Sequence, residues 1–275
     1  MDNNGVAITV PEAKQFQAVA AFSLRTGGQS PRPLDSLNLS VSQGDSPENV
    51  SRNLSVFCAS VGIRPDSIVT CKQVHEDTIA VVDAAPSPVP EADAIISIQP
   101  GIFPGVKTAD CLPVLLLDPI NRISAAIHAG WRGTVLNITG KTVRFMVKQF
   151  FADPGKLVAI LGPAIGPCCY EVDDTVLVPF RKHVPDAELF IREENRTGAA
   201  ASTGRKSYRV DLEGANRREL AIRGIPEGNI HASGLCTCCN PHLFFSYRRD
   251  GARSGRHLAV VGFRKSVEAS KKPCG

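Results

Sequence analysis

Short apolar runs separated by turns rich in proline, glycine and aspartate follow one another along this chain, and they restrict its fold more than any other feature. Such runs are typical of β-strands. Helical segments interrupt them without a strict strand–helix–strand rhythm, so a Rossmann-type sheet is not expected. We predict an α/β (α+β) fold, a single-domain sandwich of mixed β-sheets flanked by helices. The predicted strands cover residues 68–74, 79–82, 94–98, 112–117, 123–127, 157–161, 244–247 and 258–263.

Helix signals mark three segments. Ser46 is a suitable N-cap and Pro47 suits the first turn, with apolar residues following on one face. Gly224 is a suitable stop for a later helix. The first predicted helix begins at residue 46 and has positions 50, 54, 57 and 61 on one face. The second runs from after Gly133 to about Phe150, and the third covers residues 211–223. Residues 25–46 are predicted as loop and residues 196–204 as a mobile excursion.

Composition excludes several classes of protein. The chain has 275 residues, enough for one domain over residues 1–275 with a full core, and 43% of them are hydrophobic. A net charge of +4 is too small to favour nucleic-acid or membrane binding, and neither a membrane-spanning run nor a signal peptide is evident. Nine cysteines, an odd number, favour free thiols in a reducing cytoplasm. The oligomeric state stays open.

Two histidines and one cysteine at the ends of predicted strands carry the clearest chemical signal. The hairpin formed by strands 112–117 and 123–127 is expected to bring Cys111 and His128 opposite each other, and His75 ends another apolar run. Two imidazoles and one thiolate form a ligand set for Zn²⁺ that leaves a fourth position open. Such a site activates water near neutral pH. We therefore predict His75, Cys111 and His128 as metal ligands, with zinc favoured over copper.

Each of these residues also has a purely structural interpretation. Cys111 can be a buried small residue, and His75 a polar residue at a strand end. Asp110 lies directly beside the thiol, and a position used only for packing would rarely have an acidic neighbour. We take Cys111, His128 and Asp110 as the catalytic candidates.

Other polar segments allow two interpretations each. The turn with Gly130, Arg132 and Gly133 can offer amides to an anion such as phosphate, or it can be an ordinary strand-to-helix turn. A late arginine cluster that includes Arg248 can be a solvated turn or can hold phosphate. The run Cys236-Thr-Cys-Cys239 is too compact for a tetrahedral metal site of its own, so structural or incidental thiols are favoured there.

Several longer motifs resemble a single protein family along nearly the whole chain. They are Phe22-Ser-x-Arg-x-Gly-Gly, Ser36-Leu-Asn-Leu, Gly44-Asp45, Gln73-Val-His75, Thr108-Ala-Asp-Cys-Leu-Pro-Val, His128-Ala-Gly-Trp-Arg-Gly-Thr, Gly162-Pro-Ala-Ile-Gly-Pro and Phe244-Phe-Ser-Tyr-Arg-Arg. The family is the bacterial one first named laccase-domain or polyphenol oxidase proteins, and later described as purine nucleoside phosphorylases and as a peptidoglycan-editing factor. One departure is that Leu54 follows Asn53 where members commonly have arginine.

This resemblance implies a zinc site on His75, Cys111 and His128, and a fold similar to a bacterial toxin domain that deamidates with a Cys–His pair. It also implies phosphorolysis of adenosine, inosine, guanosine and methylthioadenosine, and deamination of adenosine. We expect nucleosides and phosphate as partners. The residues expected to contact substrate or phosphate are Arg25, Asn38, Gln73, Arg132 and Arg248.

Three other functions compete with this one. A Cys–His amide hydrolase acting on a cell-wall precursor would use Cys111 as nucleophile and His128 as base. A copper-dependent polyphenol oxidase is less favoured, because the chain has six histidines and no His-x-His pair, whereas four-copper laccases use more histidines, many of them in such pairs. A non-catalytic binding module is the least favoured.

Overall fold

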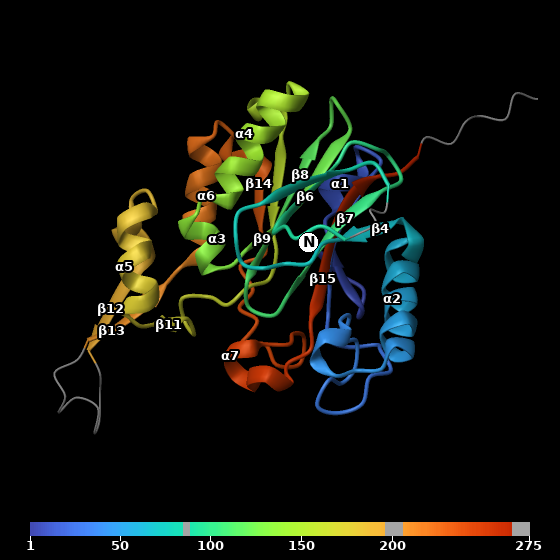
Figure 1. Cartoon of the computed structure of the whole chain (residues 1–275), viewed down its shortest axis with the longest axis horizontal. Helices are drawn as coiled ribbons and strands as arrows, with labels where there is room; N and C mark the ends of the chain where they lie inside the picture. The colour runs from blue at the N-terminus through green and yellow to red at the C-terminus, as the bar shows by residue number, and fades with distance from the viewer. Residues whose placement is uncertain (85–88, 196–205, 266–275) are drawn as a thin grey trace, which may run out of the picture.

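Two six-stranded mixed sheets form the centre of the molecule (Figure 1). The computed structural model describes residues 1–84, 89–195 and 206–265, so the predicted excursion at residues 196–204 lies outside the described residues. In spatial order, the first sheet contains β1 (Asp2–Asn3), β2 (Ala7–Thr9), β3 (Ala18–Ser23), β15 (His257–Phe263), β7 (Phe103–Thr108) and β4 (Ile68–Thr70). The second contains β14 (Ile230–Ala232), β10 (Val158–Leu161), β8 (Leu112–Asp118), β9 (Ile123–Ala129), β6 (Ala94–Ser97) and β5 (Ile79–Val82). A small third sheet contains β11 (Glu171–Val172), β13 (Lys206–Val210) and β12 (Ile191–Asn195).

The alternation of side chains along β8 explains the layering. Val114 and Leu116 point to the helix side of the second sheet, whereas Leu115 and Leu117 point into the core between the two sheets. Successive residues of a strand face opposite sides, so a continuous apolar run is expected only where both faces are covered. All seven residues of β8 are buried, as this explanation requires.

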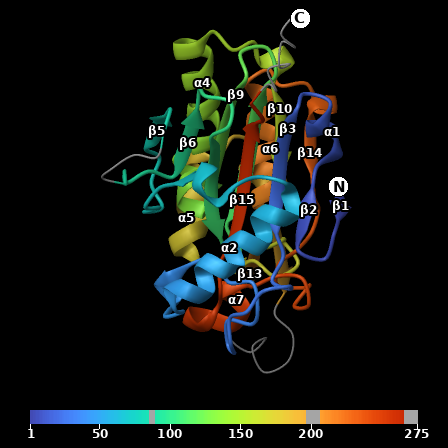
Figure 2. The same cartoon turned by 90° about the vertical axis from the view of Figure 1, so that its right-hand side faces the viewer.

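Helices cover the outer faces of the two sheets. In Figures 1 and 2, α2 (Pro47–Val61) lies over the first sheet, where Phe57 packs near Val260. On the other side, α4 (Ile138–Phe150) and α6 (Leu212–Ile222) cover the second sheet. The remaining helices are α1 (Pro11–Lys14), α3 (Trp131–Val135), α5 (Asp174–His183) and α7 (Tyr247–Asp250), with 3-10 turns η1 (Val41–Gln43), η2 (Pro65–Ser67), η3 (Pro154–Lys156), η4 (Ala187–Phe190), η6 (Glu227–Asn229) and η7 (Gly251–Arg253).

The predicted class, mixed sheets flanked by helices, is confirmed. Local signals were the most dependable. The Ser46 hydroxyl accepts from the Asn49 N–H and caps α2, and Gly224 follows α6 with a positive φ of 91°. Within the described residues, no helix has both the length and the apolar character needed to cross a membrane.

Three local predictions were wrong. Residues 244–247 form no strand, because the Ser246 hydroxyl accepts from the Arg249 N–H and begins α7. The single helix expected from Gly133 is two helices, since Asn137 adopts a left-handed conformation and caps α4 through the Gly140 N–H. The strand predicted at residues 68–74 is β4, which stops at Thr70, so His75 lies in the following loop with a φ of 63°.

Candidate functional site

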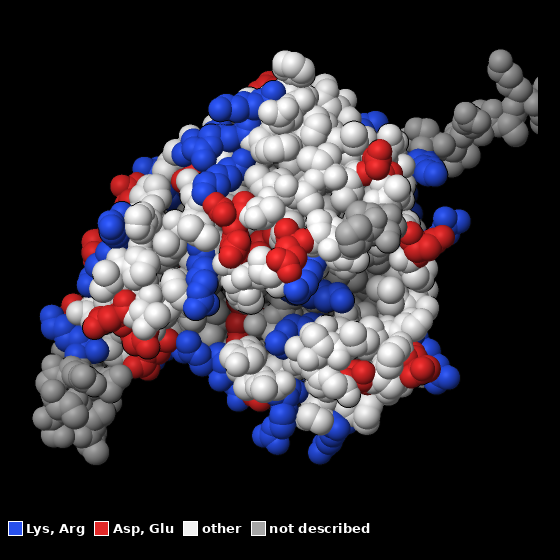
Figure 3. Space-filling view, viewed as in Figure 1, with Lys and Arg blue, Asp and Glu red and all other residues white. Residues whose placement is uncertain are grey.

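A single central pocket gathers most of the predicted chemistry. Its volume is about 810 Å³, which is within the range of small-molecule sites, about 300–1,000 Å³. Figure 3 shows a hollow near the middle of one face, with lysine and arginine side chains on its rim. The lining includes the aromatic residues Trp131, Tyr170 and Tyr247, the cations Lys72, Lys107, Arg248 and Arg256, and the three predicted metal ligands.

The ligand atoms of His75, Cys111 and His128 lie within 4.8 Å of one another, and we call these residues the His–Cys–His group. His128 is buried near the end of β9, Cys111 precedes β8, and His75 is exposed on its loop. The two imidazole rings meet edge to face with centroids 4.8 Å apart. Such a group can hold a metal ion.

The register of the hairpin differs from the expected one. β8 and β9 pair as predicted, but Pro113 lies opposite His128, and Leu112 lies opposite Ala129. Cys111 and His128 are therefore diagonal neighbours, which still lie within reach of each other across a sheet. The shift arises because Asp118 pairs with Ile123, so the turn between the strands contains the four residues 119–122.

Asp93 organises this group, and the sequence analysis missed it. Its carboxylate is fully buried and lies 2.7 Å from Nδ1 of His128. The same carboxylate accepts the backbone N–H groups of Val74, His75 and Glu76 at 3.0, 3.1 and 3.0 Å. Since a carboxylate only accepts, it fixes the proton on Nδ1 and leaves Nε2 of His128 for Cys111 or a metal. The sequence signal was an acid directly before a buried strand.

Electrostatics favour a thiolate beside an imidazolium when no metal is bound. Burial opposes ionisation of the Cys111 thiol, but His128 and His75 outweigh it and lower the pKa of Cys111 to about 6. Burial acts against the charge on His128 as well, but Cys111 and Asp93 raise the pKa of His128 to about 9. Burial likewise works against ionisation of Asp93, whose pKa is nevertheless lowered by hydrogen bonds from His128, Glu76 and Val74. A metal cation bound here would have one anionic ligand, the Cys111 thiolate.

Gly130 makes the close approach of these side chains possible. A Cβ atom at this position would lie 2.9 Å from the sulfur of Cys111 and 3.6 Å from Cδ2 of His75. The backbone φ of −68° suits any residue, so the glycine is required for space and not for conformation. The turn predicted to bind an anion leads into a short helix, because α3 spans only Trp131–Val135. The Thr134 N–H binds the Gly130 carbonyl and is therefore not available to an anion.

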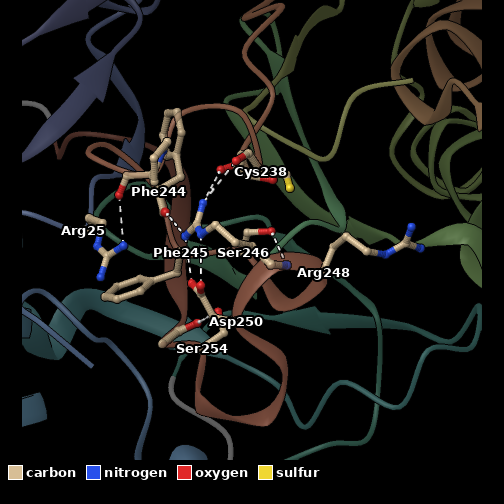
Figure 4. A network of polar contacts seen from close by, with 12 residues as sticks. Arg25, Cys238, Phe244, Phe245, Ser246, Arg248, Asp250 and Ser254 are labelled. Atoms are coloured by element: carbon tan, nitrogen blue, oxygen red, sulfur yellow. Dashed lines mark hydrogen bonds and ion pairs between the residues drawn. The ribbon is translucent and has the colours of Figure 1, made fainter. Parts of the chain in front are cut away.

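Asp110 lies on the pocket wall next to Cys111, but its carboxylate is engaged elsewhere. It accepts from the Thr237 and Ser246 hydroxyls and from the Arg248 N–H. Figure 4 shows Ser246 within a dense polar network, from which the Arg248 side chain extends away. The Arg248 guanidinium binds the Cys169 and Glu171 carbonyls and lies over the Tyr170 ring. These contacts hold the turn that precedes Cys111.

Of the residues expected to contact substrate or phosphate, only Gln73 and Arg248 line the central pocket. Gln73 exchanges two hydrogen bonds with the backbone of Lys107. Arg25 is directed to the Asp35 and Pro241 carbonyls. Asn38 is fully buried and accepts from the Arg256 N–H, while Arg132 is exposed against Trp131.

This chain has Leu54 after Asn53, where family members commonly have arginine, and Asn53 has a structural role in α2. Asn53 is fully buried and its amide binds Ser30, Ser36 and Asn38, so this residue braces the loop before α2. Arg52 lies on the exposed side and contacts Gln29. Arg256, a member of the late arginine cluster, also lines the pocket, together with Lys72 and Lys107, which were not predicted from the sequence.

Fold and site together define a mixed α/β protein with a Cys–His pocket that can hold a metal ion. The pattern of the family described as multi-copper polyphenol oxidoreductase laccase matches residues 19–264. The chain belongs to this family, which confirms the resemblance predicted from the sequence.

Named relatives give the comparison more detail. The purine nucleoside phosphorylase YlmD of Geobacillus stearothermophilus is 33% identical over 257 residues, which cover 90% of this chain and 91% of the relative. The adenosine deaminase RL5 of an unknown prokaryotic organism is 34% identical, covering 92% of this chain and 97% of the relative. The crystal structure of YlmD from Geobacillus stearothermophilus superposes with a TM-score of 0.86 at 32% identity and covers 96% and 98% of the two chains.

Proposed function

We propose that this chain is a zinc-dependent, cytoplasmic enzyme of purine nucleosides. It would convert adenosine, inosine, guanosine and methylthioadenosine with phosphate to the free base and ribose 1-phosphate or methylthioribose 1-phosphate. It would also deaminate adenosine to inosine. The observation that supports this most is the His–Cys–His group on the wall of an 810 Å³ pocket. The names of the relatives indicate the substrate class.

The donor set suits zinc. Nδ1 of His128 is held by a buried carboxylate, an arrangement that commonly supports a metal-ligating histidine. A zinc ion bound by His75, Cys111 and His128 would supply a Lewis acid and would lower the pKa of a water molecule. Asp93 would keep His128 in the tautomer that presents Nε2 to the ion. The cysteines among the described residues are all free thiols, which suits a reducing compartment.

The rest of the pocket suits a purine nucleoside and an anion. Trp131, Tyr170 and Tyr247 offer aromatic faces to a base. Burial and the charge of Cys111 raise the pKa of the Tyr170 phenol, which therefore stays a neutral hydroxyl. Arg248 and Arg256 provide positive charge for phosphate, and guanidinium groups bind phosphate in a two-pronged manner. In phosphorolysis, a phosphate oxygen bonds to C1′ as the bond from C1′ to the purine nitrogen breaks.

The central test is the phosphate requirement. Inosine should give hypoxanthine and ribose 1-phosphate only when phosphate is present, and adenosine should give inosine without phosphate. Arg248→Ala should raise the KM for phosphate more than it lowers the rate of adenosine deamination. Equal release of hypoxanthine in phosphate-free buffer would indicate hydrolysis and would remove the phosphorylase proposal.

A Cys–His amide hydrolase remains the second candidate, because Cys111, His128 and Asp93 also form a thiol–imidazole–carboxylate line. Alkylation of Cys111 separates the two. A metal-bound thiolate should react slowly until a chelator is added, whereas a free nucleophile should react rapidly in active protein with or without the chelator.

The copper proposal has less support. A blue-copper site usually adds a weak axial ligand such as methionine. No methionine lines the central pocket among the described residues, and Met146 lies on the buried face of α4 in the core.

A further inference from the structure

Four thiols outside the central pocket come together from two loops. Their sulfur atoms lie within 4.8 Å of one another, and we call this set the four-cysteine cluster. Its members are Cys168, Cys169, Cys236 and Cys239. The sequence analysis considered the run at 236–239 by itself, where it cannot complete a tetrahedron. The fold supplies the two missing sulfurs from about 70 residues away in the chain.

Sheet topology explains why the loops meet. β10 and β14 pair in parallel, so the chain leaves both strands at the same edge of the second sheet. The pairing continues beyond the strands as a parallel bridge between Ala164 and Cys236, with the Thr237 N–H bound to the Ala164 carbonyl. The Gly166 N–H donates to the sulfur of Cys236 at 3.3 Å. The cluster is therefore placed by backbone contacts and not by chance proximity of flexible side chains.

Distances within the cluster suit a shared ion. The Cys239 sulfur lies 3.4 Å from that of Cys168 and 3.3 Å from that of Cys169. In a tetrahedral site with Zn–S bonds of ~2.3 Å the sulfurs are ~3.8 Å apart, which falls between these distances and the 4.8 Å limit. A disulfide would require about 2.05 Å, and Cys239 has two almost equidistant partners.

Arginine side chains contact the backbone of both cluster loops. The guanidinium group of Arg209 binds the Cys168 carbonyl, and that of Arg248 binds the Cys169 carbonyl. Arg249 binds the Cys238 and Phe244 carbonyls and forms an ion pair with Asp250. Figure 4 shows Cys238, Phe244 and Asp250 within this polar network. Four thiolates around a divalent ion carry two net negative charges. The charges of Arg209 and Arg249 are paired with Glu194 and Asp250, so Arg248 would contribute most to stabilising them.

We propose that the four-cysteine cluster is a second metal site, which binds a structural zinc ion and is separate from the His–Cys–His group. A closed set of four thiolates is the donor set of structural zinc, whereas three ligands leave a position open. The cluster has two exposed members, Cys168 and Cys239, so an ion can enter from solvent.

The site would tie together two walls of the central pocket. Tyr170 follows Cys169 directly and lines the pocket. Thr237 lies between the two cysteines of the other loop and donates to Asp110, which precedes Cys111. A zinc ion in the cluster would therefore stabilise the loop that carries Tyr170 and the turn that places Cys111.

Zinc content per chain tests the proposal directly. Protein purified without added metal should contain two zinc ions. The double variant His75→Ala/His128→Ala should contain one, with an X-ray absorption spectrum that shows four sulfurs at ~2.3 Å. The double variant Cys236→Ser/Cys239→Ser should also contain one, bound by nitrogen and sulfur. Cys238→Ser is the matched control, because Cys238 lies in the same loop outside the cluster, and it should retain both ions.

Two results would overturn the proposal. One is a His75→Ala/His128→Ala protein that contains no zinc although its circular dichroism is that of wild type. The other is protection of the cluster thiols from alkylation that persists after chelation and denaturation, because this would indicate disulfides. The exposed single variant Cys168→Ser covers the case in which the double cysteine variant fails to fold, and it should lower zinc affinity without loss of the fold.

Discussion

Replacement of Asp93 by asparagine should weaken the metal site and the loop beside it at the same time. One oxygen of the Asp93 carboxylate accepts from the His75 N–H and faces His128, and the other accepts from the Val74 and Glu76 N–H groups. Asparagine replaces one of these oxygens with an NH₂ group, which cannot accept. In either orientation, two donors lose their partner: the partly buried Val74 and Glu76 N–H groups, or the His75 N–H together with the buried Nδ1 of His128.

The expected magnitude follows from the number of orphaned donors. A buried donor left without an acceptor costs ~1–3 kcal/mol. Because the loop N–H groups are only partly buried, the low end of this range applies, and two donors should lower the free energy of unfolding by roughly 2 kcal/mol. Loss of the carboxylate behind a metal-ligating histidine typically lowers metal affinity about 10–100-fold. We expect both effects in Asp93→Asn.

Asp118→Asn is the matched control. Its carboxylate is buried too and accepts from the Ile120 and Asn121 N–H groups and from the Asn121 side chain, but it lies at the far end of β8, away from the pocket. It should lose stability and keep wild-type zinc affinity. Urea unfolding of metal-free protein measures the first quantity. Competition with a chromophoric chelator, on a background lacking the four-cysteine cluster, measures the second. Equal zinc affinity in Asp93→Asn and wild type would refute the role given to Asp93.

Three further predictions test other parts of the argument. Gly130→Ala should displace the sulfur of Cys111 and reduce zinc binding at the pocket while the fold is retained, because the added Cβ would lie 2.9 Å from that sulfur; full zinc binding by this variant would contradict the steric argument. Burial lowers the pKa of His257 to about 3, so below pH 6.5 the unfolded chain binds a proton that the folded chain does not, and stability should fall toward pH 3 by up to ~1.4 kcal/mol per pH unit. His257→Gln should reduce this slope in pH-dependent urea unfolding and the exposed control His242→Gln should not; identical slopes would exclude His257 as the cause. His75→Ala should remove the pocket zinc while Asp93, His128 and Cys111 keep their mutual contacts, and zinc analysis alongside nucleoside assays would show whether activity is lost with the metal.

The fold could be predicted from the sequence where its signals are local. The cap at Ser46 and the apolar run of β8 each depend on a few neighbouring residues, and both were identified correctly. β7 was missed because its sequence contains Pro104 and Gly105, which normally argue against a strand. Gly105 suits the tight packing there, since a Cβ would lie 3.1 Å from the Leu258 side chain on the paired strand, which would have to shift slightly.

In the site, too, contacts between residues close in the chain could be predicted, and contacts between distant segments could not. Cys111 and His128 could be linked from the hairpin, because the intervening chain is short. Asp93 could not, because its four donors come from two separate parts of the chain and only the folded loop at 74–76 turns three N–H groups toward one carboxylate. The strand expected at 244–247 failed for a related reason, since the Phe245 N–H is taken by the ring of the distant His257.

His75 decides between the two chemistries that this pocket allows. A thiol nucleophile needs only Cys111, a base and a group that orients the base, and His128 and Asp93 already supply the last two. His75 then has no necessary role. Yet the fold holds its loop in a left-handed conformation at His75, where φ is 63°, and uses the Asp93 carboxylate to fix the N–H groups on both sides. Non-glycine residues adopt such a conformation only at an energetic cost. As a third metal ligand, His75 would give that cost a function, and we therefore propose metal binding before nucleophilic catalysis.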